Sequence, residues 1–155
     1  GSEAKKEVDT VTKITSMDIV ADAKTFAPKN LGKLAQSIIF TKVGEADYKV
    51  VVNSSYGAYV EFGTGAKVRV PAELQSVASQ FKGKKGGSFQ QGLRAIKDWC
   101  KSKGIPENAA YPIFMSILRK GQEPQPYLYP AFVKGRKQYL KDLKELLKRL
   151  TKKYD

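Results

Sequence analysis

The residues able to do covalent or metal chemistry are few in this chain of 155 residues. It contains no histidine and a single cysteine, Cys100. A Ser-His-Asp triad, a Cys-His pair and a histidine-ligated zinc are therefore excluded, and no intrachain disulfide can form. Cys100 follows Trp99 within a helical pattern, where a small buried hydrophobe is a more frequent role than a nucleophile.

The stretch "VEFGTG", from Val60 to Gly65, is the strongest remaining candidate for a reactive loop. Glu61 would need a second carboxylate or a metal to act as general acid or base, and the other acidic residues show no paired spacing. A Walker-type phosphate loop would place lysine directly after its last glycine, but Ala66 follows here. We therefore expect that the protein is not an enzyme, and that it has no catalytic residue, no cofactor and no metal ligand.

Two non-catalytic interpretations of this stretch remain. Gly63 and Gly65 allow positive φ angles and the close approach of another backbone. The Glu61 carboxylate can accept hydrogen bonds from the N–H groups of its own loop or from a cation on a neighbouring subunit. Spacing and residue type favour a subunit-docking loop and a tight turn within one chain equally.

The net charge of the chain is +13. Such an excess of positive charge favours an acidic partner, above all nucleic acid. The alternative interpretation is a solvated basic surface that only keeps the protein soluble. No apolar run approaches the roughly 20 residues needed to cross a bilayer, so we expect no membrane partner.

The length suits a single domain, 3–155, once Gly1-Ser2 is set aside because it resembles the remnant of a cleaved tag. Apolar spacing predicts a helix from residue 3 to about 26. β-branched and aromatic residues predict a hairpin from about 37 to 53, followed by a short helical turn at 56–62.

The second half of the chain is predicted to begin with a glycine- and lysine-bearing mobile loop at about 66–90. Helical patterns then give an insert at about 90–121 and a long basic helix at roughly 130–150. The expected fold class is α+β: an N-terminal helix, a small antiparallel β-sheet built on a hairpin, a helical insert, and a long C-terminal helix packed on the sheet.

Three segments occur in the order found in the tail-completion, or head–tail joining, proteins of tailed phages. They are "FAPKNLGKLAQSI" (Phe26 to Ile38), "SSYGAYVEFGTG" (Ser54 to Gly65) and "QPYLYPAF" (Gln125 to Phe132). The second resembles the family's Tyr-Ala-x-Tyr-Val-Glu-Phe-Gly-Thr signature, with Gly57 in place of alanine. The third resembles its closing Gln-Pro-Phe-Leu-x-Pro-Ala, with Tyr127 in place of phenylalanine.

This resemblance implies a structural virion protein without enzymatic activity, encoded by a phage or prophage and made in the cytoplasm of the bacterial host. It would form a ring, by resemblance a hexamer, in the neck or upper tail. Its partners would be copies of itself, a tail terminator or tail-tube protein, and head-closure or connector proteins. Tail-completion and tail-terminator roles both remain open.

Two sets of residues follow as candidate contact sites. The candidate docking residues are Tyr59, Glu61, Phe62, Gly63, Thr64, Gly65, Pro126 and Tyr127. The candidate basic residues, which would face DNA or the tail lumen and make transient phosphate contacts, are Lys67, Arg69, Lys82, Lys84 and Lys85. The alternative function, based on charge, is a small basic nucleic-acid-binding module.

Overall fold

The computed structural model describes residues 1–76 and 87–154. The chain divides into two compact units, which are treated separately below. Unit 1 combines Gly1–Asn53 with Pro126–Asp155, and unit 2 is Ser54–Gln125. The single domain expected from the length remains a prediction.

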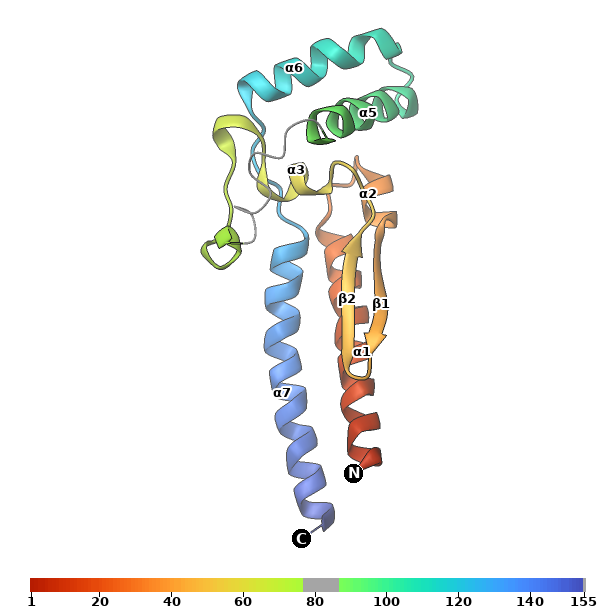
Figure 1. The fold of residues 1–155 in the computed structure, drawn as a ribbon, viewed down its shortest axis with the longest axis vertical. Helices are drawn as coiled ribbons and strands as arrows, with labels where there is room; N and C mark the ends of the chain where they lie inside the picture. Colours follow the sequence, from red (N-terminus) through yellow and green to blue (C-terminus); the bar gives the residue numbers. More distant parts are fainter. Residues whose placement is uncertain (77–86, 155) are drawn as a thin grey trace. The chain divides into compact units, whose positions relative to one another are not determined.

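Unit 1 is built from two long helices and one β-hairpin. Its elements are α1 (Ser2–Phe26), α2 (Gly32–Gln36), β1 (Ile38–Gly44), β2 (Asp47–Val52) and α7 (Leu128–Tyr154). Helix α7 runs antiparallel beside α1, and the hairpin also lies against α1 (Figure 1). The α+β class, the N-terminal helix and the hairpin expected from the sequence are confirmed, and the long C-terminal helix packs on α1.

The contact between α1 and α7 is close because small residues line it. Ala23 on α1 and Ala131 on α7 are fully buried. At Gly135 an added Cβ would overlap the side chain of Ile19, so the two backbones approach where α7 has no side chain. At the far ends of the helices, Lys153 Nζ lies 2.9 Å from a carboxylate oxygen of Glu3.

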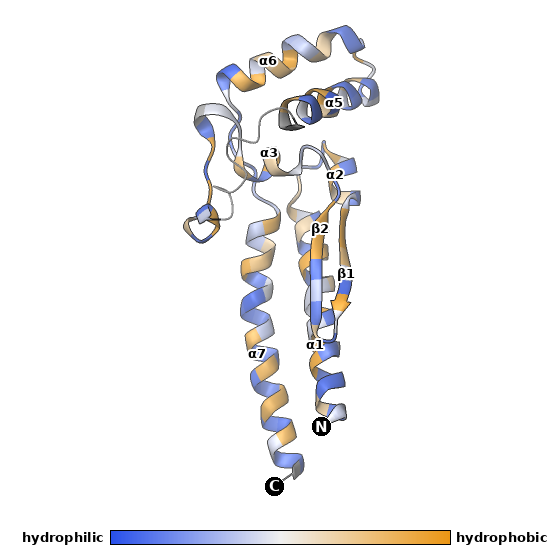
Figure 2. Cartoon of the chain, viewed as in Figure 1, coloured by the Kyte–Doolittle hydropathy of each residue, from blue (hydrophilic) through white to orange (hydrophobic). Residues whose placement is uncertain are grey.

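Helix α7 begins two residues earlier than its apolar pattern predicted. Pro130 lies in the first turn, where backbone N–H groups have no intrahelical acceptor, so the proline removes no helical hydrogen bond. Hydrophobic and hydrophilic residues alternate along the whole helix (Figure 2), as expected for a helix with one packed face.

The hairpin pairs β1 and β2 antiparallel, from Ile38 opposite Val52 to Gly44 opposite Asp47. The turn between the strands places Ala46 at a φ of 56°, a left-handed conformation that is uncommon for alanine. Because the sheet in the described part of the chain has two strands, each strand has one unpaired edge.

Unit 2 contains the predicted helical insert and the signature loop. Its elements are α3 (Gly57–Phe62), the 3-10 turns η1 (Gly65–Lys67) and η2 (Ala72–Leu74), α5 (Gly87–Ser102), η3 (Glu107–Ala109) and α6 (Ala110–Lys120). Helices α5 and α6 pack together and bury Cys100 and Phe114. Positive φ angles at Gly104 and Gly121 follow the ends of the two helices, as the helix-stop pattern predicted.

The segment expected to be a mobile loop, about 66–90, is only partly described. It contains η1 and η2, and α5 begins at Gly87, three residues before the expected start at about 90. Residues 77–86 lie outside the described part, so the mobility of this loop remains a prediction.

Candidate functional site

The signature loop leaves α3 through two glycines in the left-handed region. Gly63 has a φ of 82° and donates its N–H to the carbonyl oxygen of Tyr59 at 2.9 Å, which ends the helix. Gly65 has a φ of 59°. The positive φ angles expected at both glycines are therefore confirmed.

The backbone that approaches this loop belongs to the same chain. Thr64 donates its backbone N–H to the Gln122 carbonyl at 3.1 Å, and Gln122 returns its N–H to Thr64 Oγ1 at 2.8 Å. The Thr64 hydroxyl donates in turn to the carbonyl of Ile117, at 3.4 Å. Beyond them, Gln125 N–H binds the Val60 carbonyl at 2.8 Å. The loop is thus attached to the end of α6 and the segment that follows it.

Glycine is required at both positions by space as well as by φ. A Cβ at Gly63 would lie 2.7 Å from the carbonyl oxygen of Gln122. A Cβ at Gly65 would lie 2.9 Å from the carbonyl oxygen of Leu118. Both oxygens belong to backbone, which cannot move aside as the end of a side chain can, so any larger residue would separate the loop from α6.

The polar side chains of the loop face inward. Glu61 is 5% exposed and Thr64 is 6% exposed. Among the described residues, every buried side-chain nitrogen or oxygen has a hydrogen-bond partner, so burial of these groups is compensated. The Glu61 carboxylate is therefore not presented on the surface of the chain.

The other candidate docking residues differ in exposure. Tyr59 and Phe62 are half-buried, Gly63 and Tyr127 are buried, and Pro126 is exposed. Docking of a neighbouring subunit through any of these residues remains a prediction. The described contacts show the other interpretation left open by the sequence, a tight turn within one chain.

The candidate basic residues are only partly described. Lys67 and Arg69 are exposed, and Arg69 pairs loosely with Glu123 at 3.7 Å. Because both partners are largely solvated, this ion pair contributes little to stability. Lys82, Lys84 and Lys85 lie outside the described residues, and contact of this set with DNA remains a prediction.

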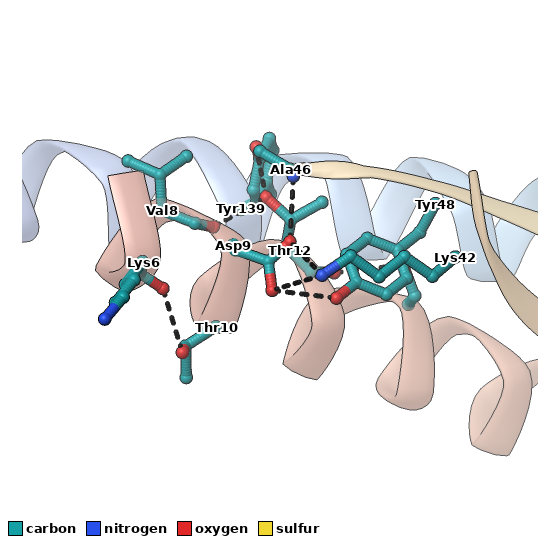
Figure 3. A network of polar contacts seen from close by, with 10 residues as sticks. Lys6, Val8, Asp9, Thr10, Thr12, Lys42, Ala46, Tyr48 and Tyr139 are labelled. Carbon is teal, nitrogen blue, oxygen red and sulfur yellow. Dashed lines mark hydrogen bonds and ion pairs between the residues drawn. The ribbon is translucent and has the colours of Figure 1, made fainter. Parts of the chain in front are cut away.

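Sequence reasoning missed a polar cluster centred on Asp9, drawn in Figure 3. The Asp9 carboxylate accepts the backbone N–H of Ala46 at 2.8 Å, the hydroxyl of Tyr48 at 3.0 Å and the ammonium of Lys42 at 3.3 Å. The signal in the sequence is weak, because one acidic residue in a helix with several charges is typical of a solvated surface.

The electrostatics of this cluster follow from its hydrogen bonds. The backbone N–H of Ala46 is the main cause of a lowered Asp9 pKa, and the Tyr48 hydroxyl and Lys42 add to it. The hydrogen bond to Asp9 raises the pKa of Lys42. Partial burial, followed by the hydrogen bond to Asp9, raises the pKa of Tyr48. The cluster holds a carboxylate that is charged at neutral pH.

One turn further along α1, Thr12 extends the connection to α7. Its hydroxyl lies 2.8 Å from the hydroxyl of Tyr139 (Figure 3). Asp9 and Thr12 together therefore fix the hairpin and α7 against α1, and they define the geometry of unit 1.

Comparison with protein families gives a match to the N-terminal part of the chain. Residues 1–63 match the family model described as "Bacteriophage HK97-gp10, putative tail-component". Over residues 1–63 the chain is similar to this family of phage tail components. The match includes α1, α2, the hairpin and α3, and it ends at Gly63 within the signature loop.

This match confirms the family resemblance stated from the sequence for two of its three segments. The Phe26–Ile38 segment lies inside the match, and so does the signature up to Gly63. Helices α5, α6 and α7 lie beyond it, so the Gln125–Phe132 segment remains a resemblance. No curated protein and no solved structure matches the chain significantly.

The described residues contain neither a cluster of metal-binding side chains nor a membrane-spanning helix. No group of three or more His, Cys, Asp or Glu side chains could hold a metal ion in the described part of the chain. None of the helices in residues 1–76 and 87–154 is long and apolar enough to cross a bilayer.

Proposed function

We infer that this protein is a structural subunit of the phage neck or upper tail, a tail-completion or head–tail joining protein that assembles into a ring. The observation that carries this proposal is the family match over residues 1–63. It covers α1 and the hairpin that packs on α1, and it reaches into the signature loop. A structural component of a tail has no reaction to catalyse.

The structure supports assembly through exposed apolar side chains and sheet edges in unit 1. On the hairpin, Ile39 is 42% exposed and Val43 is 53% exposed. Each strand also has an unpaired edge that can accept a neighbour's strand through main-chain hydrogen bonds. Ring formation requires one face of a copy to meet a different face of the next.

The experiment that tests the function is deletion of the gene in a phage or inducible prophage that encodes this chain. We expect electron micrographs to show filled heads and separate tails, because the joining ring is missing. Expression of the intact chain from a plasmid should restore joined, infectious particles. Normal particles from the deletion strain would contradict a neck or tail-joining role.

One observation favours the second candidate, a nucleic-acid-binding module. The solvent-facing side of α7 is rich in exposed lysine and arginine, including Lys137, Lys144 and Lys148. If these residues bind phosphates, affinity for duplex DNA falls with salt by a log–log slope of about 0.9 per phosphate contact. Negligible binding to DNA at physiological salt would exclude this function, while tight binding without self-association would favour it over a ring.

A further inference from the structure

Helix α7 carries an apolar stripe that is open to solvent, here called the α7 stripe. It consists of Val133, Leu140, Leu143 and Leu147. Leu140 is 54% exposed and Leu147 is 64% exposed, while Val133 and Leu143 are half-buried. Val133, Leu140 and Leu147 recur every seven residues, a spacing that keeps side chains near one side of a helix and is typical of coiled-coil contacts.

The α7 stripe lies on a different side of the helix from the contact with α1. Gly135 packs against Ile19, so its direction marks the side of α7 that faces α1. Because each residue turns a helix by about 100°, Leu140 points about 140° away from Gly135. The hairpin packs on α1. The stripe is therefore an uncovered apolar surface of unit 1, and aligned exposed apolar side chains indicate an interaction surface.

The border of the α7 stripe is basic. Lys137 and Lys144 each lie three residues before a leucine of the stripe, and Lys144 also lies four residues after Leu140, so both side chains flank it. Lys148 continues this border four residues further on. All three lysines are exposed. Within the described part of the chain, none of the three forms an ion pair.

The two acidic side chains in the described part of α7 point elsewhere. Asp142 is half-buried and accepts a hydrogen bond from Gln138 Nε2 at 2.9 Å. Glu145 is turned by about 160° from Leu147 and by about 140° from Leu140. The charge beside the stripe is therefore of one sign, and a complementary partner has to be acidic.

A second copy of this chain does not supply that acidic surface. The net charge of the chain is +13. In unit 1, Glu3, Asp9 and Asp22 each pair with a lysine of their own chain. Asp18 and Lys13 both lie beside the exposed apolar side chains of α1, so that surface has charges of both signs. Two α7 stripes would bring like charges together, which disfavours association.

Duplex DNA is acidic, but it matches only part of this surface. Its phosphates would pair with the lysines and leave the exposed leucines Leu140 and Leu147 in water. An amphipathic helix with acidic flanking residues matches both parts. Its apolar side can pack on the leucines while its carboxylates face the lysines.

We propose that the α7 stripe binds an amphipathic α-helix of another protein, with apolar residues against Leu140 and Leu147 and with Glu or Asp opposite Lys137 and Lys144. The two helices pack as in a coiled coil, where flanking charges determine the choice of partner. Val133 and Leu147 are about 21 Å apart along the helix axis, so the contact takes about four turns of the partner. The inference goes beyond the proposed function, because it concerns a different protein and does not require a ring.

The first test uses a synthetic acidic peptide of about three heptads, with leucine at the a and d positions and glutamate at the e and g positions. The control is a basic peptide in which lysine replaces each glutamate. In fluorescence anisotropy with the purified full chain, we expect the acidic peptide to bind about tenfold or more tightly than the basic peptide. Equal affinities, or no binding of the acidic peptide at several hundred micromolar, would overturn the proposal.

The second test locates the contact on α7. Leu140→Ser/Leu147→Ser and Lys137→Glu/Lys144→Glu should each weaken binding of the acidic peptide by about tenfold or more. The lysine variant should also prefer the basic peptide to the acidic one, a reversal that loss of structure cannot produce. Unchanged affinity in the leucine variant, or unchanged preference in the lysine variant, would contradict binding at the stripe.

The matched control for charge is Lys141→Glu/Lys152→Glu, which makes the same change in net charge away from the stripe. Lys141 is turned by about 100° from Leu140, and Lys152 by about 140° from Leu147. We expect this variant to bind the acidic peptide nearly as the wild type does and to keep its preference. An equal loss in the control would show that only net charge matters, and it would overturn the proposal. Thermal melting checks that every variant remains folded.

Two other occupants of the stripe give different results. A duplex oligonucleotide as occupant would need the lysines and not the leucines, and the acidic peptide would not bind. A second copy as occupant would make the wild type self-associate in analytical ultracentrifugation and leave Leu140→Ser/Leu147→Ser monomeric, again without binding of the acidic peptide. Either result overturns the proposal.

These outcomes are separate from those of the gene deletion. If the acidic peptide binds as expected and the deletion strain joins heads to tails unaided, the joining function is wrong and the helix-binding surface stands. If the deletion strain fails to join them and the acidic peptide does not bind, the function stands and the inference is wrong.

Discussion

The Thr64 hydroxyl accepts a hydrogen bond from the backbone N–H of Gln122 at 2.8 Å, joining residues that lie 58 positions apart. The signature loop thus holds the end of the helical insert in place within one chain. Because Thr64 is buried and also exchanges a backbone hydrogen bond with Gln122, its side chain completes a local connection that water cannot replace.

Replacing Thr64 by valine tests this connection. The substitution keeps the shape of the side chain but leaves the Gln122 N–H without its acceptor, so we expect a loss of about 1–3 kcal/mol of unfolding free energy. Urea denaturation followed by circular dichroism measures it. Thr64→Ser, which keeps the hydroxyl, should lose clearly less, and equal losses in the two variants would show that the hydrogen bond contributes nothing.

The glycine requirement at Gly63 is tested against a matched glycine. Gly63→Ala combines a φ of 82° with a Cβ only 2.7 Å from the Gln122 carbonyl, and we expect destabilisation by about 2–4 kcal/mol. Gly104 has a φ of 70° and open space around its Cβ position, so Gly104→Ala should cost only about 1–2 kcal/mol from backbone strain. Similar melting curves for the two variants would contradict a role for the close approach.

The lowered pKa of Asp9 predicts an acid-sensitive attachment of the hairpin. Its pKa is lower in the folded chain than in the unfolded chain, where it is about 3.9. The carboxylate therefore stabilises the fold above pH 4, and this contribution is lost as the pH falls through the folded pKa. Asp9→Asn should melt several degrees lower at pH 7, and the difference from wild type should shrink towards pH 3.

Asp47→Asn is the control for this pH dependence, because Asp47 is an exposed carboxylate at the start of β2. The melting temperature of Asp47→Asn should equal that of the wild type at each pH measured. Hydrogen exchange of the hairpin amides adds a local measure, since loss of the Asp9 contacts should increase exchange in β1 and β2 before it does so in α5 and α6. Uniform protection in Asp9→Asn would contradict the anchoring role.

Close packing at Gly135 predicts non-additive effects with Ile19. Gly135→Ala forces a Cβ into the Ile19 side chain, and we expect a cost of about 1–3 kcal/mol from overpacking. Ile19→Ala alone should cost about 2–4 kcal/mol because Ile19 is buried. The double variant should lose less than the sum of the two, as a double-mutant cycle measures. Strict additivity would show that the helices do not meet there.

Much of the fold was accessible from local patterns in the chain. The apolar spacing of α1, the β-branched run of the hairpin and the glycine stops at Gly104 and Gly121 all predicted elements that the structure contains. These elements depend on periodicity and on φ preferences, which neighbouring residues determine. The family resemblance was likewise visible in short motifs, and it is confirmed over residues 1–63.

The partners of particular side chains were not accessible in the same way. The Asp9 cluster joins residues more than 30 positions apart, and the turn that presents the Ala46 N–H exists only once the hairpin has formed. For Glu61, type and spacing allowed an exposed docking group or an inward-facing one, and burial places it inside the chain.

By itself, the sequence determined the elements, their class and the absence of histidine chemistry, because these depend on residue type and on spacing along the chain. Only the tertiary structure decided that the glycine loop meets its own chain and that Asp9 anchors the hairpin to α1. The physical reason is that burial and hydrogen bonding are properties of surfaces brought together by folding, and neighbours in sequence do not define them.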